Sequence, residues 1–344
     1  MNVNLPFVSI IVLNYNSKKH LKECFESLEK LNYPKDRYEV IMPDNASTDD
    51  SVEYVKENFP SVKILELYYN YGYAGGNNKG AEITEGKYIV FLNPDTKVHS
   101  DWLGELIKPA LVDKTIKICG CKEMKYSEEN VLSGFGGYLT IIGGGTKEKN
   151  AFLKDENYIF AGYATGASLL IEKEIFEKMG GFDENYFMHH EEVDLCWRGW
   201  IYGYKTALVP TSRIWHKEEK FSKKREKFLF HIVKNQLMSV LKNFELRNVI
   251  SALIISFFYN SFQIVKYLLL RRPRSITDII KAHLFVIRNL SKIFEKRRII
   301  QRNRKISDKE LYKMGLILPL SKSIKKEIDL SKRDYYGRVP VEEP

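Results

Sequence analysis

The stretch FVSIIVL, residues 7–13, is almost entirely apolar, and the polar residues NYN follow it at once. A run without alternation of polar and apolar side chains is typical of a strand that is covered on both faces. The same pattern returns in YIVFL, residues 88–92, which leads directly into NPDT. Both runs are therefore predicted to be inner strands of a parallel sheet, each with polar residues at its carboxyl end.

The segments between these strands favour alternating helices and strands. Apolar side chains recur at helical spacing in residues 18–31, and YEVIM, residues 38–42, is predicted as the next strand. Ser47 or Thr48 is predicted to cap the helix that follows. Alternation of this kind predicts an α/β fold with a mostly parallel central sheet and helices on both faces. Ligands of such sheets bind beyond the carboxyl ends of the strands.

Charge is distributed unevenly along the 344 residues. From Lys217 onward there are 30 Lys and Arg against 13 Asp and Glu, whereas the preceding residues carry 24 against 31. The asymmetry indicates a basic region that binds something anionic, either phospholipid or nucleic acid. Its bases accompany long aliphatic runs and no groove-reading motif, so we expect an anionic membrane surface and no nucleic acid.

The cysteines and the N-terminus point to the cytoplasm. The four cysteines form neither a C-x-x-C motif nor a Cys/His zinc pattern, so they are expected to pack in the core of a reduced protein. No basic region followed by an apolar stretch opens the chain, so no signal peptide is expected.

The predicted organisation has three parts. Residues 1–225 form the α/β domain, residues 226–318 a basic, partly apolar helical region, and residues 319–344 a polar tail. Residues 248–270 are apolar enough to approach the length of a membrane span, but their second half contains Asn, Gln and Lys. An interfacial or bundle helix flanked by basic residues is favoured over a span, and a buried soluble helix remains open.

Two polar clusters could bind a nucleotide. Tyr15 and Asp44 follow neighbouring strands, and an aromatic ring with a carboxylate suits a nucleobase, although residues 45–49 are also ordinary turn and cap residues. The glycine-rich stretch YNYGYAGGNNKG, residues 69–80, would let backbone amides approach a phosphate, with a helix predicted to start near Asn77. A plain flexible turn explains it equally well, since it matches neither a dinucleotide fingerprint nor a Walker A loop.

Three further features could carry chemistry. Asp95 in NPD could bind Mg²⁺ or Mn²⁺, or could cap a helix predicted to begin near Asp101. HHEEVDLCWR places three carboxylates in the first turn of a helix, where the dipole favours the charged form that a general base needs, although capping alone also explains them. A functional role for His216 is expected only if the fold brings it near Asp95.

The order of these motifs resembles that of the family 2 glycosyltransferases. The resemblance rests on VLNYN, DNAST, YGYAGGNNKG, FLNPDT, the GASLLIEKEIFEKMGG to HHEEVDLCWR segment and His216, and it covers about residues 5–240. It is greatest to the rhamnosyltransferase-type branch. The resemblance implies a GT-A fold and inverting, metal-dependent transfer of a hexose from a nucleotide-diphosphate sugar, with dTDP-rhamnose expected first and a UDP-sugar otherwise.

The resemblance also assigns roles by position. Glu192 takes the place of the catalytic base, with Asp194 second and Glu191 beside it, and Asp95 and His216 hold the metal. The residues expected to bind the nucleotide sugar are Leu13, Tyr15, Asp44, Asn45, Gly75, Gly76, Asn77, Asn93 and Asp95. The residues expected on the acceptor side are Gly166, Trp197 and Arg198.

Two departures from the family pattern bear on this assignment. Asn93 replaces the first acid of the metal-binding D-x-D, which affects bidentate binding and strict metal dependence. Glu192 stands where the family has Asp, and the extra methylene displaces the carboxylate by about one bond, a scale on which misplacement costs around 10²-fold in rate.

The expected function is glycan synthesis at the cytoplasmic face of the cell membrane, on a lipid-linked or polysaccharide acceptor, with the oligomeric state left open. A nucleotidyltransferase that makes nucleotide sugars would share the sheet, but LNYNSKK lacks the glycine-rich loop such enzymes carry. A catalytically weak relative that only binds glycan or nucleotide is the remaining alternative.

Overall fold

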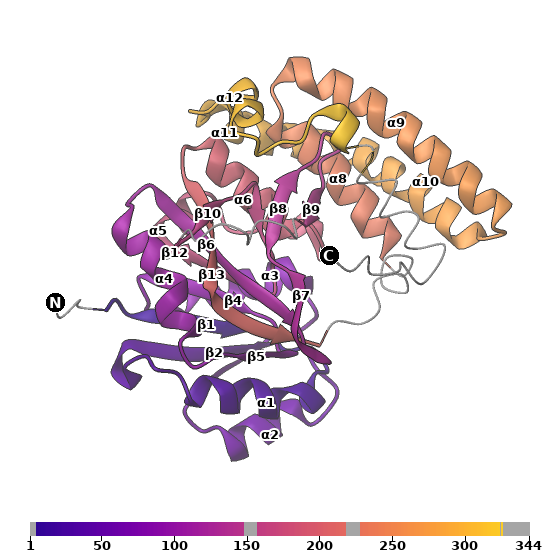
Figure 1. The fold of residues 1–344 in the computed structure, drawn as a ribbon. Helices are drawn as coiled ribbons and strands as arrows, with labels where there is room; N and C mark the ends of the chain where they lie inside the picture. The colour runs from indigo at the N-terminus through magenta and orange to yellow at the C-terminus, as the bar shows by residue number, and fades with distance from the viewer. Residues whose placement is uncertain (1–4, 148–156, 218–227, 324, 326–344) are drawn as a thin grey trace. The chain divides into compact units, whose positions relative to one another are not determined.

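The computed structural model describes residues 5–147, 157–217, 228–323 and 325 (Figure 1). The chain divides into two compact units: residues 1–137 with 147–217, and residues 138–146 with 218–344. The predicted boundary at residue 225 lies in a segment outside the described residues. Residues 326–344 of the predicted polar tail also lie outside them.

The first unit is built on a large mixed sheet. In the described residues its strands run in the order β10-β13-β6-β12-β4-β1-β2-β3, with β5 on β13 and β7 on β6. The strands are β1 (Val8–Val12), β2 (Tyr38–Asp44), β3 (Lys63–Glu66), β4 (Tyr88–Leu92), β5 (Thr96–Val98), β6 (Ile116–Lys125), β7 (Glu128–Gly134), β10 (Ile159–Phe160), β12 (Ser168–Glu172) and β13 (Lys205–His216).

Parallel pairing dominates the half of the sheet that carries the first motifs. β1 pairs in parallel with both β2 and β4, and β2 with β3, so their carboxyl ends share one edge. β12 enters antiparallel between β4 and β6. Short strands β8 (Gly136–Leu139), β9 (Gly145–Lys147) and β11 (Tyr163–Ala164) complete the set, and residues 136–137 of β8 pair with β11.

Helices cover both faces of this sheet, as predicted. The even-numbered side chains of β1 and β4 face a core with α1, α2 and α4, in which all four cysteines except Cys196 take part. The odd-numbered side chains face the other layer, where Phe91 contacts Phe176 of α5, with ring centroids 5.1 Å apart. The helices are α1 (Lys18–Glu29), α2 (Ser51–Asn58), α3 (Gly72–Glu82), α4 (Trp102–Val112), α5 (Lys173–Lys178) and α6 (Glu191–Ile201), with 3-10 turns at Lys35–Arg37 and Glu184–Tyr186.

The prediction that the cysteines pack in the core is confirmed, because all four are buried. Two helix starts differ from those predicted. α2 begins at Ser51 and not directly after Ser47 or Thr48, because Ser47 hydrogen-bonds the carboxylate of Asp44 and closes the turn before the helix. α3 begins at Gly72, more than one turn before Asn77.

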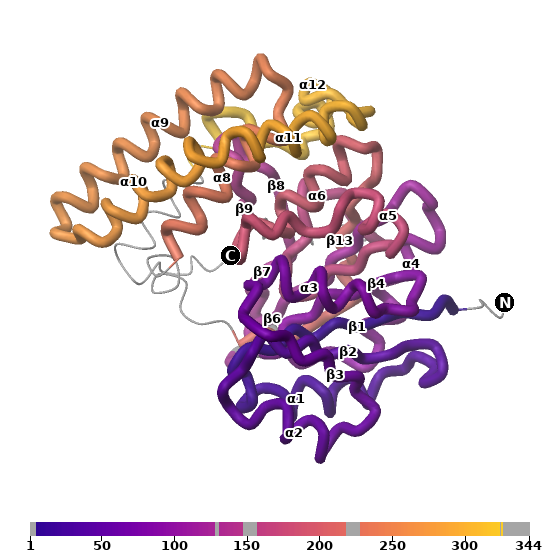
Figure 2. The backbone as a smooth tube through the Cα atoms, turned by 180° about the vertical axis from the view of Figure 1, so that it is seen from behind, coloured from indigo at the N-terminus to yellow at the C-terminus, as the bar shows by residue number. Residues whose placement is uncertain are grey.

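The second unit is helical and is shown from both sides in Figures 1 and 2. α8 packs against α10 and α11, and α9 packs against α10 and α8. α9 is the helix in the described part of the chain whose length and hydropathy would suffice to cross a membrane. The helices are α8 (Leu229–Asn243), α9 (Leu246–Leu269), α10 (Pro273–Arg288), α11 (Leu290–Arg302) and α12 (Asp308–Lys313).

Candidate active site

The polar motifs meet at the carboxyl edge of the sheet in the first unit. Asn14, two residues after β1, forms a parallel bridge with Asp44, the last residue of β2. Directly after β4, the amide of Asn93 donates to the carbonyl of Ala167, 3.0 Å away. The order β4-β1-β2 therefore brings three motifs to one edge, although the intervening chain is long.

Asp95 and His216 are in contact at this edge. The Oδ1 atom of Asp95 lies 3.1 Å from the Nε2 atom of His216, and the Nδ2 atom of Asn93 lies 3.4 Å from the same nitrogen. The imidazole is buried, and the carboxylate is only partly exposed. Asp95 does not cap α4, because β5 intervenes and Asp101 occupies the N-cap position.

A bulge in β13 explains how residue 216 reaches residue 95. Against β6, Val209 pairs with Cys121 but Arg213 pairs with Lys122, so residues 210–212 have no opposing partners in the register. Such extra residues bend a strand, and proline is tolerated at a bulge. The far end of β13 then pairs with β5, and His216 comes opposite Thr96. His216 is thus the last residue of β13.

The Asp95–His216 pair fits a divalent cation that a nucleotide also binds. Mg²⁺ takes ligands at about 2.0–2.1 Å in octahedral geometry, so two neighbouring ligands lie about 3 Å apart, and one or two carboxylates plus substrate phosphates usually suffice. The 3.1 Å separation of the two donor atoms matches that spacing. In the described residues no group of three or more His, Cys, Asp and Glu is arranged to hold a metal, so a protein-only site is not formed there.

Asp44 is engaged by its own turn. Its carboxylate accepts hydrogen bonds from Asn14 Nδ2 at 2.6 Å and from the amide of Ser47 at 2.9 Å, and it is 3% exposed. Asn14 is fully buried, and its Nδ2 also lies 2.7 Å from Ser51 Oγ. The geometry shows the turn function that the sequence left open, while a contact of Asp44 with a nucleobase stays a prediction. Asn14 is a central residue of this edge that sequence reasoning missed.

Asn45 joins β2 to the start of α3. Its Nδ2 donates to the carbonyl of Gly72, and its Oδ1 accepts from the amide of Tyr71. The side chain is buried and directed at the protein, so its role in the structure is to hold the glycine-rich segment against the sheet. Tyr15, in contrast, is half exposed beside the same edge, where a planar ligand could stack on it.

The glycines of α3 serve close packing. A Cβ atom on Gly76 would lie 2.6 Å from Leu13 Cδ1, and one on Gly75 would lie 2.9 Å from Tyr71 Cβ. Neither position tolerates a side chain without movement of its neighbour. Asn77 is buried within the helix and donates to the carbonyl of Tyr73. Because Asn77 lies in the second turn, the prediction that a helix starts at it, offering its first amides to a phosphate, is wrong.

The start of α6 carries Glu191 and Glu192 on a strained segment. Phe187, His189 and His190 have positive φ angles of 61°, 66° and 67°. Non-glycine residues adopt such angles at a cost of order 1–3 kcal/mol each, and they cluster at functional sites. The carbonyl of Phe187 accepts from the amide of Ala74 at 3.2 Å, which ties this segment to α3.

Glu192 borders the same edge of the sheet through Gly166. A Cβ atom on Gly166 would lie 3.6 Å from Glu192 Cγ and 3.6 Å from the Tyr73 hydroxyl. That hydroxyl donates to the carbonyl of Gly166 at 2.7 Å. Burial, together with the charges of Glu191 and Glu192, raises the pKa of Tyr73 well above its usual value, so this phenol stays a donor. Since Ala167 binds Asn93, Gly166 and Ala167 link Glu192 to the NPD turn.

The remaining residues of α6 are interior, and this corrects three expectations. Asp194 is fully buried and accepts from Arg198 Nε at 2.8 Å and from the Tyr186 hydroxyl at 3.2 Å. The other guanidinium nitrogens of Arg198 donate to the carbonyls of Met179 and Gly181. Trp197 is fully buried as well. Trp197 and Arg198 therefore do not line an acceptor site, and the Asp194 carboxylate is held in a structural ion pair.

Comparison with known proteins identifies the family and the fold. Residues 9–179 match the family model described as glycosyl transferase family 2. A mannosyltransferase from Pyrobaculum calidifontis, solved with GDP-Man and Mn²⁺, superimposes with a TM-score of 0.56 at 15% identity, over 98% of this chain and 89% of that chain. The fold is therefore the GT-A fold. Residues 9–179 belong to glycosyl transferase family 2.

Two curated relatives from Haloferax volcanii match shorter parts. The glycosyltransferase AglE is 32% identical over 106 residues, which are 30% of this chain and 35% of AglE. The low-salt glycan biosynthesis hexosyltransferase Agl10 is 23% identical over 209 residues, which are 56% of this chain and 62% of Agl10. The matches thus span less than two thirds of either relative.

Proposed function

We propose that this chain is an inverting glycosyltransferase that moves a hexose from a nucleotide-diphosphate sugar to a hydroxyl group of a lipid-linked or polysaccharide acceptor. The observation that carries the proposal is the contact between Asp95 and His216 at the carboxyl edge of the sheet. By the resemblance in motif order, that contact falls where the donor diphosphate is expected to bind. dTDP-rhamnose is the first donor to test, on motif resemblance, and UDP-hexoses are the next.

Asp95 and His216 would hold a Mg²⁺ or Mn²⁺ ion together with the diphosphate of the donor. The ion, when bound, neutralises charge on the departing nucleoside diphosphate. The neighbour solved with GDP-Man and Mn²⁺ supports a divalent cation beside a nucleotide sugar. Tyr15, which is half exposed, would stack on the base, and the hydrogen bond of Asn14 to Asp44 would hold the adjacent turn.

Glu192 would act as the general base. It accepts the proton of the acceptor hydroxyl while the hydroxyl oxygen forms a bond to the anomeric carbon and the bond from that carbon to the diphosphate oxygen breaks. A single displacement inverts the configuration, and no covalent intermediate with the protein forms. The strained segment 187–190 leads into the start of α6, and the Tyr73 hydroxyl holds the carbonyl of Gly166, which lies beside the Glu192 side chain.

The acceptor is proposed to be presented at the cytoplasmic face of the cell membrane. Support comes from the excess of Lys and Arg over Asp and Glu from Lys217 onward and from the apolar helix α9. The test of the function is a donor screen with Mg²⁺ or Mn²⁺ that measures released nucleoside diphosphate. Turnover of one donor that is lost in Glu192→Gln supports the proposal, and no turnover of any dTDP-, UDP- or GDP-sugar contradicts it.

A further inference from the structure

Helix α9 has its apolar side outward. Its inward positions include the polar residues Ser256, Asn260 and Gln263, all at most 5% exposed. Asn260 and Gln263 lie on the side packed in the bundle, where Gln263 binds the Tyr259 hydroxyl. The outward large side chains are nearly all apolar: Leu246, Ile250, Ile254, Phe257, Phe258, Phe262, Val265, Leu268 and Leu269, each more than half exposed.

This pattern is the reverse of that of a helix whose outer face meets water. A surface helix of a soluble bundle turns its apolar stripe to the core and its polar residues outward. The α9 stripe runs the whole helix, about 36 Å for 24 residues. Contiguous exposed apolar surface of this size marks a site of protein or membrane contact.

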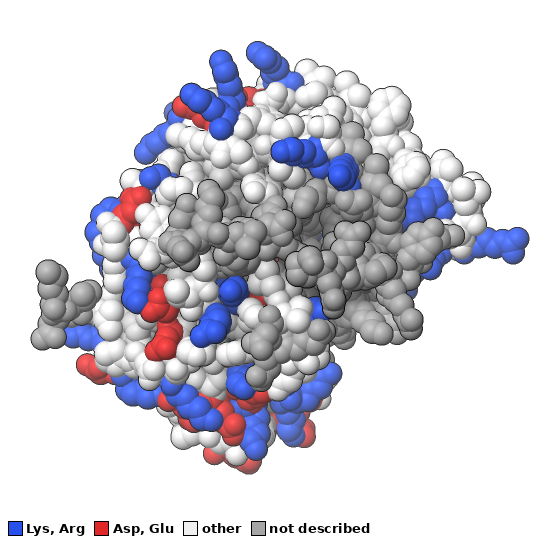
Figure 3. All heavy atoms as spheres, in the orientation of Figure 1, with Lys and Arg blue, Asp and Glu red and all other residues white. Residues whose placement is uncertain are grey.

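The neighbouring helix extends the same surface and adds charge. α10 exposes Ile280, Leu284 and Ile287 at helical spacing. The turn between α9 and α10 and the start of α10 are basic, with Arg271, Arg272 and Arg274 all exposed. Figure 3 shows the surface over α9 as mostly uncharged, with Lys and Arg at the tip of the hairpin.

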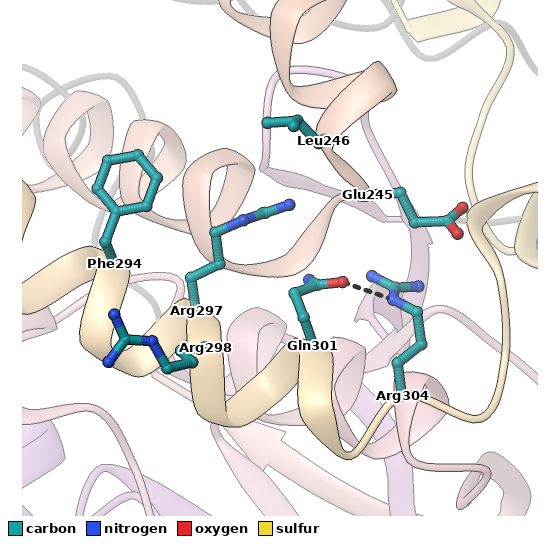
Figure 4. Close-up of a pocket in the computed structure, with 7 residues that line it drawn as sticks. All are labelled: Glu245, Leu246, Phe294, Arg297, Arg298, Gln301 and Arg304. Atoms are coloured by element: carbon teal, nitrogen blue, oxygen red, sulfur yellow. Dashed lines mark hydrogen bonds between the residues drawn. The ribbon is translucent and has the colours of Figure 1, made fainter.

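A basic pocket lies at the other end of the stripe. It has a volume of about 430 Å³ and includes Leu246, the first residue of the stripe, and the exposed ring of Phe294. Three arginines, Gln301 and the acidic Glu245 also line it, as Figure 4 shows. Arg304 donates to Gln301 Oε1 and forms an ion pair with Asp308, 3.1 Å away. Burial, and secondarily the charge of Arg304, lowers the pKa of Arg297 below its usual value. Its guanidinium donates to the carbonyls of Leu241 and Phe244 through Nη1 only.

We propose that the outer face of α9 and α10 lies in the interfacial region of an anionic phospholipid bilayer, with a lipid phosphate bound in the arginine pocket. An apolar face flanked by basic residues is the signature of a helix that lies in the plane of the interface. The positive charge at both ends of the stripe complements anionic headgroups. This inference rests on the proposed function and specifies which surface of the chain contacts the membrane.

The packing of α10 decides between lying on the bilayer and crossing it. α9 packs along α10, and the Nδ2 atom of Asn260 lies 3.5 Å from His283 Nε2. α10 carries Asp278 and Lys281 in its middle, and Lys281 is exposed. A crossing α9 would draw these charges into hydrocarbon, which is costly. A position in the interface leaves them at headgroup level.

The first test is flotation of the full chain with vesicles, without any nucleotide. Wild-type protein is expected to bind phosphatidylcholine vesicles that contain phosphatidylglycerol, and to bind less as salt rises. F257E/F258E is expected to lower partitioning at least about tenfold, since two rings lose their apolar contact. V112E is the matched control, because Val112 is an exposed apolar residue of α4 in the first unit and its change leaves binding intact.

The second test concerns charge. R271Q/R272Q/R274Q is expected to weaken binding to anionic vesicles about fivefold per charge removed at low salt. K22Q/K30Q/K114Q removes three exposed charges of the first unit and leaves binding unchanged. R298Q is expected to reduce the preference for phosphatidylglycerol over phosphatidylcholine. Equal binding by wild type and F257E/F258E, or no binding of wild type to anionic vesicles, overturns the proposal.

The third test measures depth. Spin labels on I250C, F257C and V265C are accessible, whereas burial raises the pKa of each native thiol to about 12 and keeps it unreactive. An interfacial helix places all three labels at one shallow depth, and a spanning helix places the middle label deepest. A dimer in solution that F257E/F258E dissociates identifies a second copy as the occupant and overturns the proposal. Donor hydrolysis is measured on F257E/F258E as well. If this variant still hydrolyses the donor, a failure of the membrane proposal is distinguished from a failure of the glycosyltransferase assignment.

Discussion

Asp95 and His216 are 121 positions apart in the chain, yet Oδ1 of the first lies 3.1 Å from Nε2 of the second. Asp95 lies in the turn between β4 and β5, and His216 ends β13; β12 and β6 separate β4 from β13 in the sheet. The bulge at residues 210–212 and the short strand β5 close that gap. A carboxylate and an imidazole directed at each other beside a nucleotide edge form the centre of the proposed donor site.

Removal of either partner should abolish most donor turnover. Asp95→Ala or His216→Ala is expected to lower kcat by about 10²–10³, the usual effect of losing one electrostatic stabiliser of a leaving group. The measurement is release of nucleoside diphosphate under saturating donor. Asp36→Ala, which removes an exposed carboxylate far from the edge, should behave as wild type. Full activity of Asp95→Ala would contradict the assignment of this carboxylate.

Glu192 and Asp194 should respond differently to loss of charge. Glu192→Gln is expected to lower kcat about 10²–10⁴-fold without changing the thermal midpoint, since general base catalysis is lost and packing is kept. Asp194→Asn leaves the buried Arg198 guanidinium without its counter-charge, and breaking such a pair costs about 3–5 kcal/mol of stability. The two readouts, turnover and thermal unfolding, separate a catalytic carboxylate from a structural one. If Glu192→Gln unfolds early and Asp194→Asn does not, the roles are reversed.

The glycines of α3 offer a matched pair. Gly76→Ala is expected to destabilise the first unit by about 1–3 kcal/mol, because its Cβ would overlap the Leu13 side chain. Gly104→Ala, in α4, has no atom within 4 Å of its Cβ and should stabilise the protein by about 0.5–1 kcal/mol. Chemical denaturation measures both. Equal effects at the two sites would mean that α3 does not need to approach β1 closely.

Asn14 should matter for stability although no motif singles it out. Asn14→Ala leaves Asp44 without its buried amide donor and is expected to cost about 1–3 kcal/mol. Asn32→Ala removes an exposed amide that binds Asp101 and should cost less than about 0.5 kcal/mol. A double-mutant cycle with Asp44→Asn gives the coupling free energy between Asn14 and Asp44. A coupling free energy near zero would contradict a stabilising role of their hydrogen bond.

Local sequence patterns predicted the helices and strands. The features that these patterns did not predict depend on contacts between residues far apart in the chain. The apolar runs at residues 7–13 and 88–92 identified inner strands, because a strand covered on both faces needs no polar side chain. The roles of Trp197 and Arg198 were missed because α6 is buried on nearly all sides, so helical periodicity did not separate an inner from an outer face. The bulge of β13 has only a weak signal, Pro210, and Asn14 resembles any polar residue that ends a strand.

The positive φ angles at His189 and His190 could not be predicted from the sequence, since only a few per cent of non-glycine residues adopt such angles, even though histidine is enriched among them. The resemblance alone placed Glu192 at the active edge, and its contact with Gly166 followed from the packing of α6. The extra methylene of Glu192 relative to Asp does not crowd Gly166. Even a Cβ atom added to Gly166 would lie 3.6 Å from Glu192 Cγ, which is an ordinary van der Waals distance.

The most direct measurement is a titration of Mn²⁺ in the presence of UDP or dTDP, followed by electron paramagnetic resonance of free Mn²⁺, with wild type, Asp95→Ala and Asp36→Ala. The account predicts that wild type and Asp36→Ala bind one Mn²⁺ with nucleotide, and that Asp95→Ala loses this site. Binding of Mn²⁺ and nucleotide by Asp95→Ala at wild-type affinity would contradict it.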